Sequence, residues 1–168
     1  RFRIRIAREL DVRPDSVEAF CIGEHGDSQV PVWSQVRIGG RLLDELAEEE
    51  PERWALDRAA VEKSTVEAGW EIANKKGSTE FGIGAAAAEL IGACNTVVVL
   101  CDSREILPCS LPSLWNGTEI YASRPALING GGHPDPLPLK LTEGEEKAYE
   151  ESRKMMAEYR RLKLDGRM

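Results

Sequence analysis

The sequence lacks any apolar run that could cross a membrane. Its longest run, residues 96–101, has the length of a β-strand, whereas a membrane span requires roughly 18 apolar residues. It also lacks an excess of basic residues, because 22 Lys and Arg stand against 29 Asp and Glu, giving a net charge of −7. An acidic chain has no positive footprint for nucleic acid or anionic lipid. We therefore expect no membrane and no nucleic-acid partner.

Cysteine and histidine are scarce, with four and two residues respectively. No C-x-x-C pair is present, and the first residues, RFRIR, lack the apolar core of a secretion signal. This pattern favours free thiols and a cytoplasmic location over a disulfide framework. A zinc site built on Glu24, His25 and Asp27 would need further ligands at set spacings, and none is visible. We expect no metal.

Hydrophobic periodicity and punctuation predict several helices. Phe2, Ile6 and Leu10 recur every four residues, which is one face of a helix. Residues 77–79 (GST) interrupt the helical pattern. A T-x-x-E capping box at Thr142 predicts the start of the last helix. The predicted helices cover residues 2–10, 51–76, 84–93 and 143–162. The small residues of 84–93 predict close packing against a neighbour.

Strand-like segments make up much of the rest. They cover residues 17–22, 35–38, 96–101, 105–107, 120–129 and, as an edge strand, 137–141. Strands and helices do not alternate regularly, and no G-x-G-x-x-G follows a strand and opens a helix. The pattern indicates a mixed α+β fold. A chain of 168 residues fits one domain, residues 1–168.

The loop after the first predicted strand contains the best candidate for acid–base chemistry. Residues 23–28 read GEHGDS, with His25 between two glycines. A histidine transfers protons near neutral pH, and the flanking glycines allow a substrate to approach closely. The residues alone leave a solvated turn as an equal alternative. A hydrolase reading with Ser28 as nucleophile is weaker, since no strand–serine–helix elbow surrounds it.

The order of four segments resembles the L-lactate dehydrogenases and the lactate-dehydrogenase-like malate dehydrogenases. Residues 23–34 (GEHGDSQVPVWS) are similar to the catalytic-histidine segment of that family. Residues 1–3 (RFR), 76–84 (KGSTEFGIG) and 125–130 (PALING) agree with three further family segments in order and approximate spacing. The resemblance covers nearly the whole chain, but it corresponds to the second, substrate-binding half of a family member.

This resemblance implies a fold of mostly antiparallel strands packed with long helices, and a hydride transfer between NAD and a small 2-oxo or 2-hydroxy acid. His25 would be the acid/base that exchanges a proton with the substrate oxygen. Arg1 would grip the substrate carboxylate through two parallel hydrogen bonds. Thr79 would line the substrate pocket, and Ile83 would pack on the nicotinamide ring.

Parts of the family pattern are missing from these 168 residues. The Rossmann half with its dinucleotide-binding glycines, the carboxylate that orients the histidine, and the mobile loop with the specificity residue would all lie upstream. We expect the chain alone to be inactive without that half, because a histidine without its carboxylate partner loses tautomer control. The resemblance also implies a homodimer or homotetramer. A non-catalytic oligomerisation or binding domain of the same fold remains the alternative.

The residues at positions 3 and 18 bear on regulation. Arg3 matches a family residue that binds fructose 1,6-bisphosphate, but Glu18 stands where allosteric bacterial members have a histidine. A carboxylate repels a phosphate, so we expect no activation by that effector.

The substrate preference rests on other positions. Thr79 and the G-I-G of 82–84 are more typical of lactate dehydrogenases, whereas Gly69 is slightly more typical of malate dehydrogenases. We favour lactate over malate.

Overall fold

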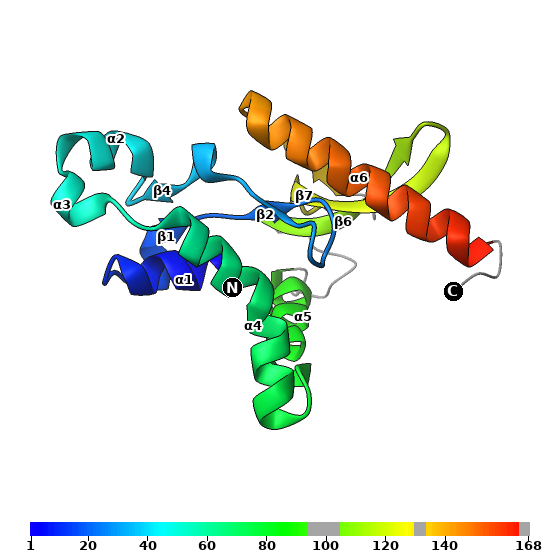
Figure 1. Ribbon diagram of the computed structural model, residues 1–168, viewed down its shortest axis with the longest axis horizontal. Helices are drawn as coiled ribbons and strands as arrows, with labels where there is room; N and C mark the ends of the chain where they lie inside the picture. Colours follow the sequence, from blue (N-terminus) through cyan, green and yellow to red (C-terminus); the bar gives the residue numbers. More distant parts are fainter. Residues whose placement is uncertain (94–104, 130–133, 165–168) are drawn as a thin grey trace.

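The structure is a computed structural model that describes residues 1–93, 105–129 and 134–164. Antiparallel strands run through its middle, with helices on either side (Figure 1). The helices are α1 (Phe2–Glu9), α2 (Leu43–Glu49), α3 (Pro51–Trp54), α4 (Arg58–Lys76), α5 (Glu80–Ala93) and α6 (Glu143–Leu164). Short 3-10 turns lie at Pro14–Ser16 and Trp33–Gln35.

The described strands form three small sheets, and each strand pair is antiparallel. One sheet contains β1 (Val17–Glu18), β4 (Arg37–Ile38) and β5 (Arg41–Leu42). The second contains β2 (Cys21–Ile22) and β3 (Val30–Pro31). The third contains β6 (Ile106–Trp115), β7 (Thr118–Leu127) and β8 (Asp135–Pro136). This arrangement confirms the predicted α+β class.

The main core lies where α1, the short strands and α4 meet. The spacing of Phe2, Ile6 and Leu10 places all three on the buried face of α1, as predicted. They pack with Trp33, Val36 and Val61 of the surrounding elements. A second apolar cluster, built on Ile22, Val30 and Val32, packs beneath α6 through Tyr149. The two clusters fix α1 and α6 to the same set of short strands.

Helix α6 lies across β6 and β7 (Figure 1), and its start confirms the predicted capping box. The Glu145 N–H donates to Thr142 Oγ1 at 3.3 Å, and the Thr142 N–H donates to Glu145 Oε2 at 2.8 Å. The same carboxylate accepts hydrogen bonds from the N–H and the hydroxyl of Ser34, at 2.9 and 2.7 Å. Glu145 therefore both caps its helix and ties it to the segment that follows β3.

Several predicted boundaries were wrong. The predicted helix 51–76 is two helices, because Ala55 takes an extended conformation and Asp57 caps α4 by accepting from the Ala60 N–H. The predicted strand 17–22 is interrupted between β1 and β2. Residues 137–141 form no strand, and the edge pairing with β7 comes from β8. The predicted strand 96–101 lies outside the described residues.

Residues 108–119 lie between the predicted strands 105–107 and 120–129 and were not predicted as strand, but they form the middle of a long hairpin. β6 and β7 pair over ten residues each, from Ile106 opposite Leu127 to Trp115 opposite Thr118. The turn places Asn116 and Gly117 at φ values of 44° and 77°. These left-handed conformations are those of a two-residue hairpin turn, for which Asn-Gly is the favoured pair.

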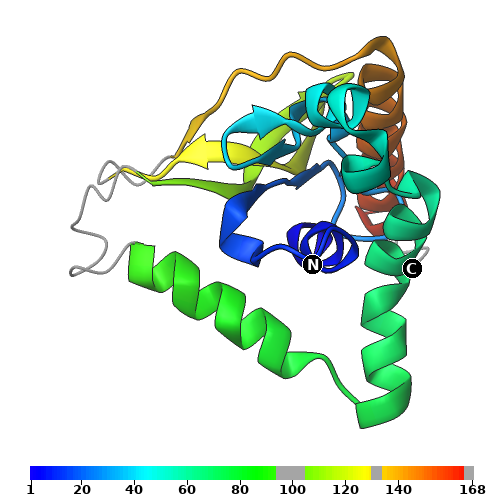
Figure 2. The same cartoon turned by 90° about the vertical axis from the view of Figure 1, so that its left-hand side faces the viewer.

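Helices α4 and α5 meet at a sharp corner, which Figure 2 shows at the foot of the molecule. Gly77 ends α4 at φ 86°, in the left-handed conformation typical of a helix C-terminus. The side chains of 80–88 in α5 are exposed, so residues 84–88 do not form the predicted close packing with any other described residue. None of the helices among the described residues is long and apolar enough to span a bilayer.

The Glu145 carboxylate makes a pH-dependent contribution to stability. Burial alone would raise its pKa, but hydrogen bonds from Ser34 and Thr142 outweigh burial and hold the pKa below the ordinary 4.5. A lowered folded-state pKa stabilises the fold above the unfolded value, and this contribution disappears as pH falls through the folded value. We predict that Glu145→Gln lowers the free energy of unfolding at pH 7, and that this deficit shrinks below pH 4.5. Urea denaturation from pH 3 to 7 checks this; an equal deficit at both ends would contradict it.

Candidate functional site

The loop between β2 and β3 presents His25 to solvent. Gly23 begins the loop at φ 87° and forms two backbone hydrogen bonds with Ser123 of β7, at 2.9 and 2.8 Å. His25 itself is exposed. Within the described part of the chain, no hydrogen bond or ion pair holds the imidazole. A substrate oxygen could therefore approach either ring nitrogen.

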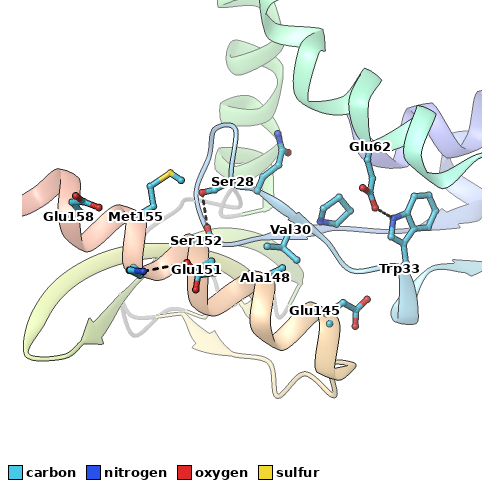
Figure 3. Close-up of a pocket in the computed structure, with 14 residues that line it drawn as sticks. Ser28, Val30, Trp33, Glu62, Glu145, Ala148, Glu151, Ser152, Met155 and Glu158 are labelled. Atoms are coloured by element: carbon cyan, nitrogen blue, oxygen red, sulfur yellow. Dashed lines mark hydrogen bonds and ion pairs between the residues drawn. The ribbon is translucent and has the colours of Figure 1, made fainter.

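The residues on either side of His25 are fixed more firmly than His25 itself. The Glu24 carboxylate accepts a hydrogen bond from the Ser28 N–H at 3.1 Å and a second, short one from the Ser28 hydroxyl. The Glu24 N–H donates to Ser152 Oγ of α6 at 2.9 Å. Figure 3 shows Ser28 on the loop directed at Ser152 on the helix, with their oxygens 3.1 Å apart.

Arg1 directs its guanidinium toward the corner between α4 and α5. A methyl group built on Gly69 of α4 would lie 3.2 Å from Arg1 Nη1, and one on Gly82 of α5 would lie 3.8 Å from Arg1 Nη2. Among the described residues, no carboxylate pairs with this guanidinium. Its planar set of N–H donors matches the two oxygens of a carboxylate.

Trp33 links the Arg1 segment to the His25 segment. The ring of Phe2, the residue after Arg1, meets the Trp33 ring edge-on, with centroids 4.8 Å apart and planes at 88°. The Trp33 indole N–H donates to Glu62 Oε1 of α4 at 2.5 Å. Trp33 follows the His25 loop by way of β3. One buried indole therefore connects both candidate segments to α4.

Thr79 and Ile83 lie on the α5 side of the site. Thr79 is half-buried in the turn before α5. Ile83 is on α5, next to Gly82, and is 62% exposed. The structure thus brings the Arg1 guanidinium close to the start of α5. No hydrogen bond or ion pair among residues 1–93, 105–129 and 134–164 joins His25 to Arg1 or Thr79.

Comparison with known proteins places the chain in a family. The family model described as "lactate/malate dehydrogenase, alpha/beta C-terminal domain" matches residues 1–160. The chain belongs to this family. It is 32% identical over 162 residues to L-lactate dehydrogenase 3 of Bacillus cereus, covering 95% of this chain and 50% of that protein. It is 34% identical over 158 residues to the L-lactate dehydrogenase of Latilactobacillus sakei, covering 93% and 47%.

A solved structure shows the same fold. It is a lactate dehydrogenase from a Medee basin deep-sea metagenome library, with a TM-score of 0.81 and 26% sequence identity. The match covers 94% of this chain and 49% of that one. The chain therefore spans about half the length of the lactate dehydrogenases that it matches, and the family resemblance seen in the sequence is confirmed.

A groove among the described residues lies behind the His25 loop rather than beside Arg1. It has a volume of about 600 Å³ and runs between α6, β3 and Glu62 of α4 (Figure 3). Its charged lining is mainly acidic, with Glu62, Glu145, Glu151 and Glu158 beside Lys154. Such a lining repels the carboxylate of a 2-oxo acid. The Arg1 guanidinium, which lies near Gly69 and Gly82, suits a carboxylate better.

Among the described residues, the cysteine thiols and the acidic side chains show no second reactive site. Cys21 and Cys109 are free thiols, as predicted, and Cys94, Cys101 and His133 lie outside the described residues. Burial raises the pKa of Cys21 to about 11, so it is a neutral, weakly nucleophilic thiol at pH 7. Within the described ranges, no group of three His, Cys, Asp or Glu side chains could hold a metal ion.

Sequence reasoning missed Ser152 and the roles of Glu24 and Ser28 in the loop. Ser28 was considered as a nucleophile, whereas its hydroxyl donates to Glu24. Ser152 lies in an ordinary amphipathic helix, where a serine carries no local signal. The only sequence-level hint was the glycine at 23, whose left-handed conformation and closeness to Ser152 exclude a larger residue.

We predict that Gly69→Ala in the protein that contains this chain weakens substrate binding. The added methyl would lie 3.2 Å from Arg1 Nη1, inside the ordinary contact distance, so the guanidinium must shift. We expect the KM for a 2-oxo acid to rise by about threefold or more. Gly84→Ala is the matched control, since it also replaces a helical glycine but meets nothing within 4 Å. Equal KM values for the two variants would contradict the prediction.

Proposed function

We propose that residues 1–168 form the substrate-binding and catalytic domain of an NAD-dependent L-2-hydroxyacid dehydrogenase, with pyruvate and lactate as the favoured pair and oxaloacetate and malate next. The observation that carries this proposal is the exposed His25 on a loop whose flanking residues are fixed by hydrogen bonds to α6 and β7. Family membership supports the same reaction. A solvated turn histidine would need no such support.

In this reaction His25 is the acid/base. It gives a proton to the substrate oxygen in the direction of reduction and takes it back in the direction of oxidation. Arg1 binds the substrate carboxylate through two parallel hydrogen bonds. Holding the carboxylate fixes the carbonyl carbon in one orientation, which replaces a costly alignment step in the reaction. Thr79 lines the pocket on the α5 side.

The chain offers one contact to NAD, which supplies or accepts the hydride when bound. Ile83 is 62% exposed at the start of α5, beside the glycine that approaches Arg1. An exposed aliphatic side chain fits the flat face of a nicotinamide ring. The described residues contain no glycine-rich loop between a strand and a helix that would hold the phosphates. We therefore assign the rest of NAD binding to a Rossmann domain outside these 168 residues.

Exposed apolar side chains support a protein partner on the α4–α5 side. Trp70, Phe81 and Ile83 are 68%, 70% and 62% exposed. Large exposed apolar side chains on two consecutive helices favour an interaction site here. We assign these side chains to contact with the Rossmann domain. The family resemblance also predicts a homodimer or homotetramer, and a cytoplasmic location. Without the Rossmann domain we expect no turnover from this chain.

The same exposed surface favours a second candidate function, a non-catalytic oligomerisation or binding domain of this fold. The two candidates differ in whether His25 is needed for turnover in the natural protein. A binding domain would keep its oligomeric state and its partner in a His25 variant and would show no NADH oxidation in the wild type.

We predict that His25→Asn in the natural protein that contains this chain lowers kcat/KM for pyruvate-dependent NADH oxidation by about 10²- to 10⁴-fold, the usual contribution of a general acid. Arg1→Lys should raise the KM for the 2-oxo acid more than it lowers kcat, because lysine cannot form the paired contact. NADH binding, followed by fluorescence, should remain unchanged in both. Wild-type turnover that survives His25→Asn would contradict the assignment.

The same assay decides between pyruvate and oxaloacetate as the preferred substrate. A higher kcat/KM for pyruvate supports the lactate assignment. A higher value for oxaloacetate moves the protein to the malate group and leaves the roles of His25 and Arg1 unchanged.

We predict that fructose 1,6-bisphosphate does not activate the enzyme. Glu18 is exposed on β1 and stands where the activated relatives have a histidine, so its carboxylate repels a phosphate. Adding the effector should leave kcat and KM for pyruvate unchanged. The matched variant is Glu18→His, which removes the repulsion between the Glu18 carboxylate and the phosphate of the effector. Activation of the wild-type protein would overturn the prediction.

A further inference from the structure

Ser152 is a buried polar residue whose hydroxyl faces the His25 loop instead of the apolar interior. It lies on α6 with 0% of its surface exposed. A buried hydroxyl is costly unless it is hydrogen-bonded. Its partners, Glu24 and Ser28, stand 128 and 124 residues earlier in the sequence. They flank His25 on either side.

The direction of each hydrogen bond follows from the number of protons available. The Glu24 N–H can only donate, so Ser152 Oγ accepts this bond at 2.9 Å. The Ser28 hydroxyl donates its proton to the Glu24 carboxylate. A hydroxyl has one proton. Ser152 must therefore donate its own proton to Ser28 Oγ, 3.1 Å away.

These three bonds form a closed ring. It runs from the Glu24 N–H to Ser152, from Ser152 to Ser28, and from Ser28 back to the Glu24 side chain. Each hydroxyl in the ring both donates and accepts, and such chains strengthen one another. The Ser28 N–H adds a fourth bond to the same carboxylate, at 3.1 Å. The loop is thus held on both sides of His25.

The space around Ser152 admits little change. A methyl group on Gly23 would collide with the Ser152 hydroxyl and would lie 3.0 Å from its Cβ. Gly23 is also fixed to Ser123 of β7 by two backbone hydrogen bonds. The loop therefore cannot approach α6 more closely, and Ser152 cannot be enlarged without moving it.

We infer that Ser152 is a positioning residue for His25, and that α6, through this hydroxyl, fixes the backbone of the loop that carries the acid/base. The inference rests on the proposed function, in which His25 exchanges the proton. The imidazole has no hydrogen-bonding partner of its own among the described residues. Its place is therefore determined by the backbone of the loop, and the ring of hydrogen bonds fixes that backbone. Proton transfer to a substrate oxygen requires a histidine placed within hydrogen-bond reach.

The test compares Ser152→Ala with wild type in the complete natural protein that contains this chain. The variant removes one oxygen, so the Glu24 N–H loses its acceptor and Ser28 Oγ loses the proton that Ser152 donates. Hydrogen exchange followed by mass spectrometry should show the Glu24 amide exchanging about tenfold faster or more, as its protection is lost. The kcat for 2-oxo-acid reduction should fall about 10- to 100-fold, the effect of misplacing a reacting group. The Kd for NADH should not change.

A matched control separates positioning from general loss of stability. Ala157→Gly alters another buried position on α6 and weakens the helix, without touching the loop. It should leave both the exchange of the Glu24 amide and kcat near wild type.

An isotope effect gives a further readout. Wild-type reduction with C4-deuterated NADH should show a smaller isotope effect on kcat than the Ser152→Ala reaction, because a misplaced His25 slows the chemical step. If Ser152→Ala does not fold, Ser28→Ala opens the same ring and should show the same pattern with a smaller loss.

The outcomes distinguish this inference from the proposed function. Faster exchange together with a lower kcat in Ser152→Ala, and not in Ala157→Gly, supports the positioning role. An active wild type whose Ser152→Ala variant keeps kcat within about twofold, or keeps its Glu24 amide protected, overturns the positioning role alone. A wild type that oxidises no NADH with any 2-oxo acid refutes the proposed function, and the positioning role falls with it.

Discussion

The edge-on contact between Phe2 and Trp33 determines how the parts of the site are arranged. Phe2 follows the arginine that faces the α4–α5 corner, and Trp33 follows the loop that carries His25. The indole N–H is in turn hydrogen-bonded to Glu62 of α4, and the Arg58 guanidinium lies 5.1 Å from the centre of the indole ring. Because Phe2 is 3% and Trp33 8% exposed, neither ring can move without opening the main core. The segments therefore hold their places through apolar packing, and the polar groups remain available for chemistry.

Local patterns in the sequence were enough to predict those parts of the fold that depend on local interactions. The four-residue spacing of α1 gave its buried face, the glycine at 77 gave the end of α4, and the T-x-x-E sequence gave the start of α6. Each rests on contacts within a few residues. His25 and Arg1 were found differently, since the residues alone left a solvated turn open and the family resemblance selected them. Their roles remain predictions.

Most of the features that sequence reasoning missed depend on partners far away in the chain. The Ser152–Glu24 bond joins residues 128 positions apart, and no periodicity in α6 signals it. The edge strand was placed at 137–141 because its composition suited an edge, but pairing with β7 selected Asp135–Pro136. The break before α4 follows from an aspartate cap that competes with a helix pattern running through it. In the first two cases tertiary contacts decided the outcome, whereas the cap of α4 is a local contact between Asp57 and Ala60.

The distance along the chain between Glu24 and Ser152 also has a consequence for biosynthesis. A ribosome makes the His25 loop long before it makes α6, so the nascent chain cannot complete the hydrogen-bond ring when the loop first emerges. Closing so long a loop carries a large entropic cost that must be offset by the packing of α6 on β7. The loop thus takes its final shape late in folding, after most of the domain has been translated. A chain whose translation stops before Ser152 would contain Arg1, His25 and Thr79, the residues proposed to bind and convert the substrate, and would still lack the support of the His25 loop.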